Sequence, residues 1–242
     1  MSKHIKLLLL AGNTYRSRAY AQTIERLKLK NIEVCAIFYG FGEKKCSFTE
    51  TNEVSNSFFN KEALFIPDLN ENPIETFSTN NWESTIVDSV DVNSQEVVDC
   101  ISTYSPDIVV FAGYGGQILK SNLFKLPCQY LHMHPGNLPL ERGSTTIYYS
   151  ILNQRKCTVT SFFMSEEIDQ GINLLKSEYN IPLRNVNTDI YYDNIIRADC
   201  FGKTLLTLAK KEKFNSHQEF QNEEYYVIHP VLKHIAILSL KH

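Results

Sequence analysis

Two histidines on alternate residues are the first candidates for chemistry in this sequence. His132 and His134 stand at the end of an apolar run that starts at Tyr130, directly before Pro135-Gly136. Residues i and i+2 of a strand point the same way, so two titratable imidazoles would converge beside a rigid turn. The carboxyl ends of strands in an open α/β sheet face the ligand crevice. Taken alone, a histidine pair is more often a polar cluster or a fortuitous surface pair, and acid–base chemistry on a bound substrate is the functional alternative.

An acidic turn at residues 166–171 is the second candidate. It lies between two strand-like runs, Cys157 to Met164 and Ile172 to Ile181, and such a turn is usually ordinary solvated surface. Because one helix joins the strands near 130 and 160, we expect these strands to be neighbours that bring their C-terminal ends to one rim. Asp169 would then pair with His134, raise the pKa of its imidazole and fix its tautomer.

A metal site is a rival interpretation of the same residues. An HxH pair can ligate zinc with a further carboxylate such as Asp169. The remaining histidines lie in the N-terminal arm or beyond residue 216, and no HExxH motif or close cysteine pair accompanies them. The six cysteines are spaced too widely for a CxxC motif or a disulfide scaffold. We therefore expect no metal, reduced thiols and a cytoplasmic protein.

The elements that would position these residues alternate between strands and helices. An apolar run from Ile5 to Ala11 is followed by a break and then by helical spacing from Ser17 to Lys30. Later segments repeat this alternation, which predicts an α/β fold with a doubly wound, mostly parallel, Rossmann-like sheet. Further strands are expected at Ile32–Tyr39 and Ile108–Ala112, a short one near Leu64, and helices at Ser94–Tyr104, Ser144–Asn153 and Asp189–Lys211.

Length and charge limit the class of partner. The chain has 242 residues, 24 Lys and Arg against 27 Asp and Glu, and a formal net charge of −3. This balance argues against an extended nucleic-acid surface and against a polybasic membrane surface, and no apolar run approaches the ~20 residues of a membrane span. We expect a core over residues 1–185 and a C-terminal helix with a small extension over residues 186–242.

A longer pattern runs through both candidate sites. His132-Met-His-Pro-Gly-Asn-Leu-Pro-Leu-Glu-Arg-Gly143 is followed by an amphipathic helix, a Thr/Val-rich strand and Ile168-Asp-Gln-Gly171. This order resembles the 10-formyltetrahydrofolate-dependent formyltransferases, which carry Asn-x-His-Pro-Ser/Gly, Leu-Pro-x-x-Arg-Gly and, about 35 residues on, Asp-x-Gly. His134 and Asp169 match the family in identity and spacing. The family's Asn two residues before the catalytic His is His132 here.

The resemblance implies roles for particular residues. His134 and Asp169 would catalyse transfer of a formyl group from 10-formyltetrahydrofolate, and His132 would replace the family's amide as a donor to the formyl oxygen. Because of that replacement, a non-catalytic folate- or nucleotide-binding module stays as the alternative. Folate binding falls to Gln117, Ile118, Leu119, Met164 and Asp169, and substrate binding to Arg142, Asn13, Pro135 and Gly136.

Comparison with the branches of that family limits which acceptor amine we expect. The methionyl-tRNA enzymes add a C-terminal barrel and a basic surface, which the short tail and the charge of −3 do not match. The glycinamide-ribonucleotide enzymes have a glycine-rich phosphate loop that Gly12-Asn13-Thr14 meets only in part, and they remain an alternative. We expect a nucleotide-linked amino sugar, on a route to surface glycans. The tail at Glu223–Pro230 would either cover the cleft as a strand or meet a partner subunit in a homodimer.

Overall fold

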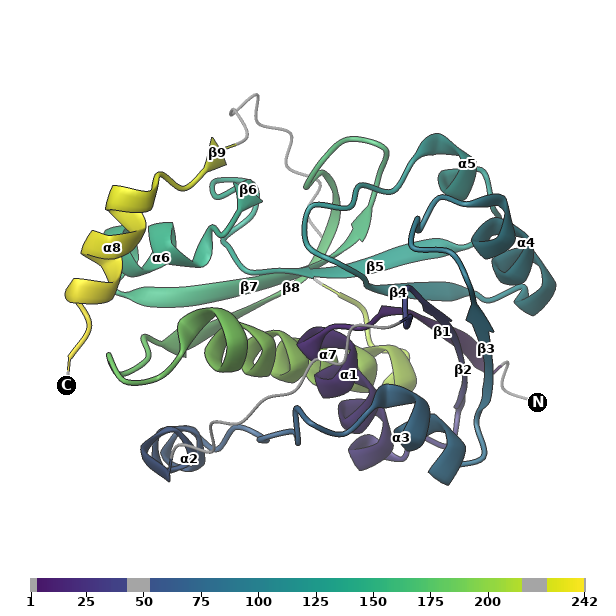
Figure 1. Cartoon of the computed structure of the whole chain (residues 1–242), viewed down its shortest axis with the longest axis horizontal. Coiled ribbons are helices and arrows are strands. Elements are labelled where there is room, and N and C mark those ends of the chain that lie inside the picture. Colours follow the sequence, from purple (N-terminus) through teal and green to yellow (C-terminus); the bar gives the residue numbers. More distant parts are fainter. Residues whose placement is uncertain (1–3, 43–52, 215–225, 242) are drawn as a thin grey trace.

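One sheet organises the chain, and the computed structural model describes residues 4–42, 53–214 and 226–241 of it (Figure 1). The strand order is β3-β2-β1-β4-β5-β7-β8, with β1 to β5 parallel and β7 and β8 antiparallel, as the doubly wound, mostly parallel prediction requires. The strands are β1 (Ile5–Gly12), β2 (Ile32–Tyr39), β3 (Glu83–Val87), β4 (Ile108–Ala112), β5 (Gln129–His134), β7 (Lys156–Met164) and β8 (Gly171–Asn180).

Two hydrophobic clusters separate the faces of the sheet. Alternate residues of β1 enter different clusters, Leu7 and Leu9 one and Leu8 and Leu10 the other, because successive side chains of a strand point to opposite faces. The helices α1 (Tyr15–Leu27), α3 (Pro73–Thr79) and α7 (Asp193–Lys210) lie on one side of the sheet and α4 (Gln95–Tyr104) and α5 (Ser121–Phe124) on the other (Figure 1). Covering both faces explains why the central strands β1 and β4 are largely continuous apolar runs.

The remaining elements flank the sheet at its β7 side. The helix α6 (Ile147–Gln154) packs on β7 and on the last helix, α8 (Pro230–Leu238), while a π-helical turn η1 (Thr188–Tyr192) leads into α7. Two short strands, β6 (Gly143–Ser144) and β9 (Tyr226–Val227), pair in parallel. No helix among the described residues is long and apolar enough to cross a membrane.

Two expectations about individual elements are wrong, and one strand was not predicted. No strand forms near Leu64, where the chain is irregular after the helix α2 (Glu53–Lys61). The edge strand is β3 instead, in which only Val87 is buried, so its sequence has no apolar run to detect. Ser144 does not start a helix, because it pairs with the tail in β6 and α6 begins at Ile147. Of the tail segment 223–230, residues 223–225 lie outside the described part of the chain.

Candidate active site

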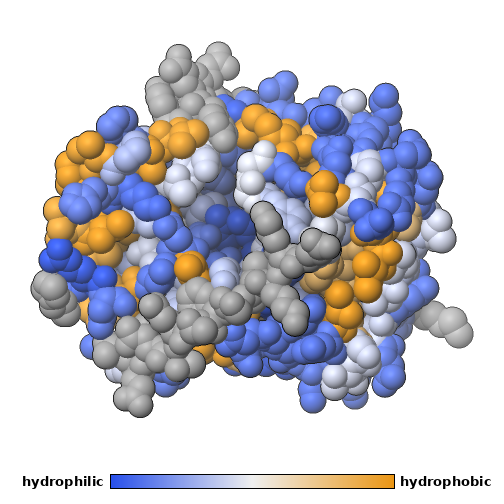
Figure 2. Space-filling view, viewed as in Figure 1, coloured by the Kyte–Doolittle hydropathy of each residue, from blue (hydrophilic) through white to orange (hydrophobic). Residues whose placement is uncertain are grey.

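A pocket opens where β4 and β5 end. It is lined by His132 and His134 of β5, by the loop after β4, by residues 143–145, by Met164 to Asp169, and by two arginines from α1 and α7. Figure 2 shows the hollow near the middle of this face, with a hydrophilic floor. The pocket therefore stands at the carboxyl ends of parallel strands, as the fold predicts.

His134 is held between two acceptors at the wall of this pocket. Its Nδ1 lies 3.4 Å from Oδ1 of Asp169, and its Nε2 lies 2.6 Å from the carbonyl oxygen of Glu141. The Thr146 hydroxyl, 3.2 Å from Nε2, donates its own proton to the Pro135 carbonyl and can only accept from the ring. Because a carbonyl and a carboxylate both accept, the geometry suits the doubly protonated imidazolium. With 2% of the side chain exposed, the ring is shielded from water.

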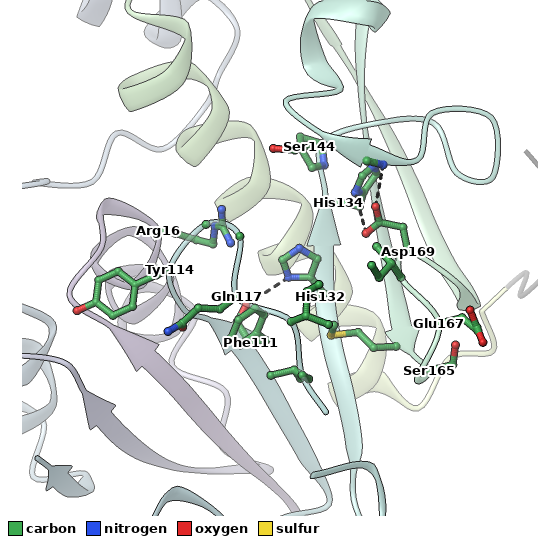
Figure 3. Close-up of a pocket in the computed structure, with 18 of the residues that line it drawn as sticks. Arg16, Phe111, Tyr114, Gln117, His132, His134, Ser144, Ser165, Glu167 and Asp169 are labelled. Atoms are coloured by element: carbon green, nitrogen blue, oxygen red, sulfur yellow. Dashed lines mark hydrogen bonds and ion pairs between the residues drawn. The ribbon is translucent and has the colours of Figure 1, made fainter. Parts of the chain in front are cut away.

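Asp169 is brought to His134 by the loop between β7 and β8 (Figure 3). Its Oδ2 accepts the backbone N–H of Gly143 at 2.8 Å, so both carboxylate oxygens have partners. Burial alone would raise the pKa of Asp169, but the His134 charge and the Gly143 N–H outweigh burial and lower the pKa from 3.8 to about 2. The carboxylate is therefore ionised at neutral pH.

The predicted pairing of His134 with Asp169 is confirmed, but the expected route to it is wrong. β7 runs antiparallel to β5, with His134 opposite Thr160 and Leu131 opposite Phe163. The C-terminal ends of these two strands therefore point in opposite directions, and no common rim exists. The six-residue loop at 165–170 returns the chain to the pocket, and Asp169 takes a φ of 51° in it.

A buried carboxylate supports the turn that carries His134. Glu141, 8% exposed, accepts the backbone N–H of Asn137 at 2.9 Å and the Ser150 hydroxyl. Gly136 packs tightly within this turn. A Cβ on Gly136 would lie 2.8 Å from both the backbone carbonyl oxygen of Glu141 and Nε2 of His134. This crowding explains the Pro-Gly pair of the motif. Pro135 lines the pocket, whereas Gly136 acts behind it.

His132 also faces the pocket, but its hydrogen bond runs away from it. Its Nδ1 lies 3.4 Å from the carbonyl oxygen of Phe111, which can only accept a hydrogen bond. Burial, followed by the positive charges of Arg16 and Arg197, lowers the pKa of His132 well below its usual 6.5. The ring is therefore neutral, with its proton on Nδ1.

The five residues expected to bind folate all line the pocket: Gln117, Ile118, Leu119, Met164 and Asp169. Tyr39 donates to Oε1 of Gln117 at 2.7 Å, and the Gln117 amide donates to the Val90 carbonyl at 2.8 Å. These bonds hold the loop after β4 in place. Ile118 is 53% exposed and Leu119 only 3%, so Ile118 presents the apolar face toward a ligand.

Of the four residues expected to bind the acceptor, only Pro135 lines the pocket, and Gly136, Arg142 and Asn13 do not. Arg142 donates to the carbonyl of Ile168 at 2.6 Å and so ties its own loop to the Asp169 loop. Asn13 accepts from Arg18 at 2.8 Å, and its backbone N–H donates to the Tyr114 hydroxyl. Both side chains stabilise loops around the pocket.

Two arginines that sequence reasoning missed stand in the pocket instead. Arg197 of α7 is paired with Asp193 at 2.9 Å and donates to the Met133 carbonyl. Arg16 lies in the first turn of α1, which a reciprocal Thr14–Ser17 capping box starts. Among the described residues the enclosed Nε of Arg16 has no hydrogen-bond partner. Burial and then Arg197 lower the pKa of Arg16 to about 10. The position of Arg16, just after the first strand, was the available signal.

The zinc interpretation finds no set of donors. In the described ranges, no three His, Cys, Asp or Glu side chains are grouped as metal ligands would be. Nδ1 of His134 faces Asp169 directly, and Nδ1 of His132 faces a backbone carbonyl. The three side chains thus interact with one another and with the backbone.

Comparison with known families assigns the chain. A model of the formyl transferase family matches residues 61–196, more than half of the chain and the whole of the histidine and Asp169 region. The chain belongs to the formyl transferase family. Among curated relatives, the methionyl-tRNA formyltransferase of Clostridioides difficile strain 630 is 28% identical over 168 residues, 68% of this chain and 52% of that protein. The methionyl-tRNA formyltransferase of Borrelia hermsii is 30% identical over 148 residues, which are 61% of this chain and 47% of that protein. The chain spans about half the length of the curated relatives it matches.

Solved structures share the fold of this family member. A sugar N-formyltransferase from Shewanella sp. matches with a TM-score of 0.58 and 20% identity, covering 97% of this chain and 87% of that one. Phosphoribosylglycinamide formyltransferase from Campylobacter jejuni matches with a TM-score of 0.58 and 18% identity, covering 86% and 99%. At these identities the likeness establishes the formyltransferase fold alone.

Proposed function

We propose that this protein transfers the formyl group of 10-formyltetrahydrofolate to the primary amine of a nucleotide-linked amino sugar. The observation that carries the proposal is the buried His134–Asp169 pair, 3.4 Å apart, on the wall of a pocket that also holds an unpaired Arg16 Nε. Family membership supports formyl transfer as the reaction. The walls of the pocket suggest where the folate, the formyl group and the acceptor would each bind.

The wall after β4 suits the folate. Ile118 and Met164 offer apolar surface to a flat heterocycle, and the bonded Gln117 keeps the loop in one conformation before a ligand arrives. Main-chain groups from Met164 to Asp169 supply donors and acceptors along the same wall. The N10-formyl group would then lie toward the two histidines.

His134 would stabilise the charge that forms during transfer. Attack by the amine turns the formyl carbonyl into an oxyanion, and a fixed positive charge near it lowers the barrier most where water is excluded. Asp169 orients the imidazole through the 3.4 Å contact and places a carboxylate beside its Nδ1. Holding both reactants in near-attack geometry contributes further, on the order of 7–11 kcal/mol in favourable cases.

Arg16 supports an acceptor that carries phosphate. Its guanidinium stands in the pocket at the start of α1, where the helix dipole also favours an anion. A nucleoside diphosphate would complete the hydrogen bonds of Arg16 beside the amine to be formylated. The net charge of −3 disfavours a polyanion as large as tRNA. The Shewanella structure, whose name states a sugar substrate, spans 97% of this chain and favours the same branch.

Glycinamide ribonucleotide is the second candidate acceptor. It is also a primary amine with a phosphate, so Arg16 suits it equally. The match to the Campylobacter phosphoribosylglycinamide formyltransferase covers 99% of that protein's chain. Surface-glycan synthesis, a homodimer and a catalytic unit ending at residue 185 remain predictions that accompany the sugar assignment.

A turnover assay tests this function. Purified protein is mixed with 10-formyltetrahydrofolate and, in separate reactions, with nucleoside diphosphate amino sugars and with glycinamide ribonucleotide. Release of tetrahydrofolate with formylation of an amino sugar is the expected result, and Asp169→Ala serves as the inactive control. Turnover with glycinamide ribonucleotide alone would select the second candidate. Retained folate binding with no turnover on any amine would overturn the enzyme assignment in favour of a binding module.

A further inference from the structure

The ring of His132 presents one specific nitrogen to the pocket. It lies between Phe111 and Phe162, with ring centroids 5.8 and 6.0 Å from its own, and its Nδ1 is 3.4 Å from the Phe111 carbonyl oxygen (Figure 3). Because the carbonyl can only accept, Nδ1 carries the hydrogen of this bond. Among the described residues no hydrogen bond is formed at Nε2. Nε2 of the neutral ring is then a lone-pair acceptor.

The charges around His132 keep the ring neutral. Arg16 approaches from α1, Arg197 from α7 and His134 from the same strand, and all three oppose a second proton. Asp169, on the β7–β8 loop, is the one group acting on the ring in the opposite direction, and its oxygens already face His134 and Gly143. Burial adds to the three cations, so the pKa of His132 lies well below 6.5. The lone pair on Nε2 is thus available at neutral pH.

Two other titratable groups of the pocket, Asp169 and His134, already have partners. Both oxygens of Asp169 accept hydrogen bonds, and both nitrogens of His134 face acceptors. The amine must nevertheless lose a proton when it becomes an amide.

We propose that Nε2 of His132 accepts the proton that the acceptor amine loses, so that this residue is a general base and not a donor to the formyl oxygen. The inference rests on the proposed formyl transfer. The amine nitrogen bonds to the formyl carbon, and the carbonyl pair moves to oxygen. The N–H proton then passes to Nε2. The oxygen pair returns as the C–N10 bond breaks, its electrons go to N10, and the imidazolium of His132 delivers the proton to N10. The product amide and tetrahydrofolate account for every atom, and His132 ends neutral.

This role gives a physical meaning to the departure from the family pattern. The family's Asn at this position is an amide, which can donate and accept hydrogen bonds but cannot carry a proton away. A neutral imidazole can do so in both directions within one catalytic cycle. His132→Asn therefore separates the two explanations, because it restores the family's residue while removing the base.

The tautomer is measured first, on the intact protein and without any substrate. Nitrogen NMR of protein labelled with 15N-histidine should show His132 as a neutral ring protonated on Nδ1 at pH 7, identified by the signal missing in His132→Asn. A ring protonated on Nε2, or an imidazolium at pH 7, would overturn the proposal. This measurement is independent of turnover, whereas failure of the wild type to formylate any amine overturns the proposed function itself.

Kinetics then test the base. His132→Asn should bind 10-formyltetrahydrofolate as the wild type does but lose about 100-fold in kcat, within the usual range for removal of a general base. Added imidazole should raise the kcat of His132→Ala at least tenfold. This rescue should increase with pH, because more of the added imidazole is then neutral. His234→Asn, on α8 away from the pocket, is the matched control and should keep full activity. Wild-type kcat in His132→Asn, or no rescue of His132→Ala, would show that His132 is not the base.

Discussion

Replacing Asp169 with Asn should destabilise the protein by about 2 kcal/mol at pH 7. The pKa of Asp169 falls from 3.8 to about 2 on folding because of the His134 charge and the Gly143 N–H, which outweigh burial. At ~1.4 kcal/mol for each tenfold change in proton affinity, this difference corresponds to about 2 kcal/mol. With 15% of the Asp169 side chain exposed, water screens the contact little. Asn keeps the shape of the side chain, removes the charge and replaces one acceptor oxygen with an amide donor.

The pH dependence of this effect has a definite sign. A carboxyl group whose pKa is lowered by folding stabilises the native state above its unfolded pKa, and the contribution is lost as the pH falls through the folded pKa. The stability difference between wild type and Asp169→Asn should therefore be full above pH ~5, shrink to about half near pH 3 and disappear below pH ~2. The two proteins should converge in acid.

Urea unfolding followed by circular dichroism, at several values of pH between 7 and 3, measures this difference. Glu166→Gln is the matched control, because it neutralises an exposed carboxylate of the same loop and should change the free energy of unfolding by less than ~0.5 kcal/mol. Equal stability of wild type and Asp169→Asn at pH 7 would refute the reasoning. A difference that stays constant from pH 7 to 3 would refute it as well, since its cause could not then be the carboxylate charge.

Three further predictions follow from single contacts. Arg16→Ala should raise the KM for a phosphate-bearing acceptor about 10- to 100-fold without changing the KM for folate, since a charged hydrogen bond to the phosphate is lost. The control Arg142→Ala should leave the acceptor KM within about twofold of the wild-type value. If steady-state kinetics gave the larger increase for Arg142→Ala, the anion would be assigned to Arg142. Gly171→Ala should lower the free energy of unfolding by more than ~2 kcal/mol in thermal unfolding, because Gly171 has a φ of +149° and its added Cβ would lie 1.8 Å from a backbone oxygen. Gly42→Ala, where the Cβ would meet open space, should lower it by less than ~0.5 kcal/mol. Similar losses for both variants would contradict this prediction. His134→Ala should lower kcat at least 100-fold in single-turnover assays while folate still binds, and substantial residual activity would exclude His134 from the chemistry.

Sequence periodicity predicted the elements that are buried on both faces. The strand from Ile5, the helix after it and the strand from Ile32 are found as β1, α1 and β2, because strands covered on both faces must be apolar along their whole length. The edge strand β3 escaped prediction because four of its five residues are not buried. A strand paired on one side only, with its side chains half in water, has little hydrophobic pattern to detect.

The pairing of residues far apart in sequence followed a different rule. That His134 and Asp169 meet was predicted from neighbouring strands and then from the family motif, although the assumed strand direction was wrong. Strand direction depends on which edges are free when the sheet closes, and no local residue pattern encodes it. Arg142 lies in the loop after β5 and Arg16 in the first turn of α1, and only the tertiary structure turns Arg142 toward a carbonyl and Arg16 into the cavity.

Local chemistry, then, is what the sequence by itself determined: an α/β chain of net charge −3 with the His-x-His-Pro-Gly and Asp-x-Gly pattern of formyl transfer. The roles of the two histidines were decided only by tertiary structure. His132 and His134 are the same residue type two positions apart, yet one faces a carboxylate and the other a carbonyl between two arginines. A proton's position on an imidazole depends on the charges and acceptors within a few ångströms, and distant segments of the chain supply most of these.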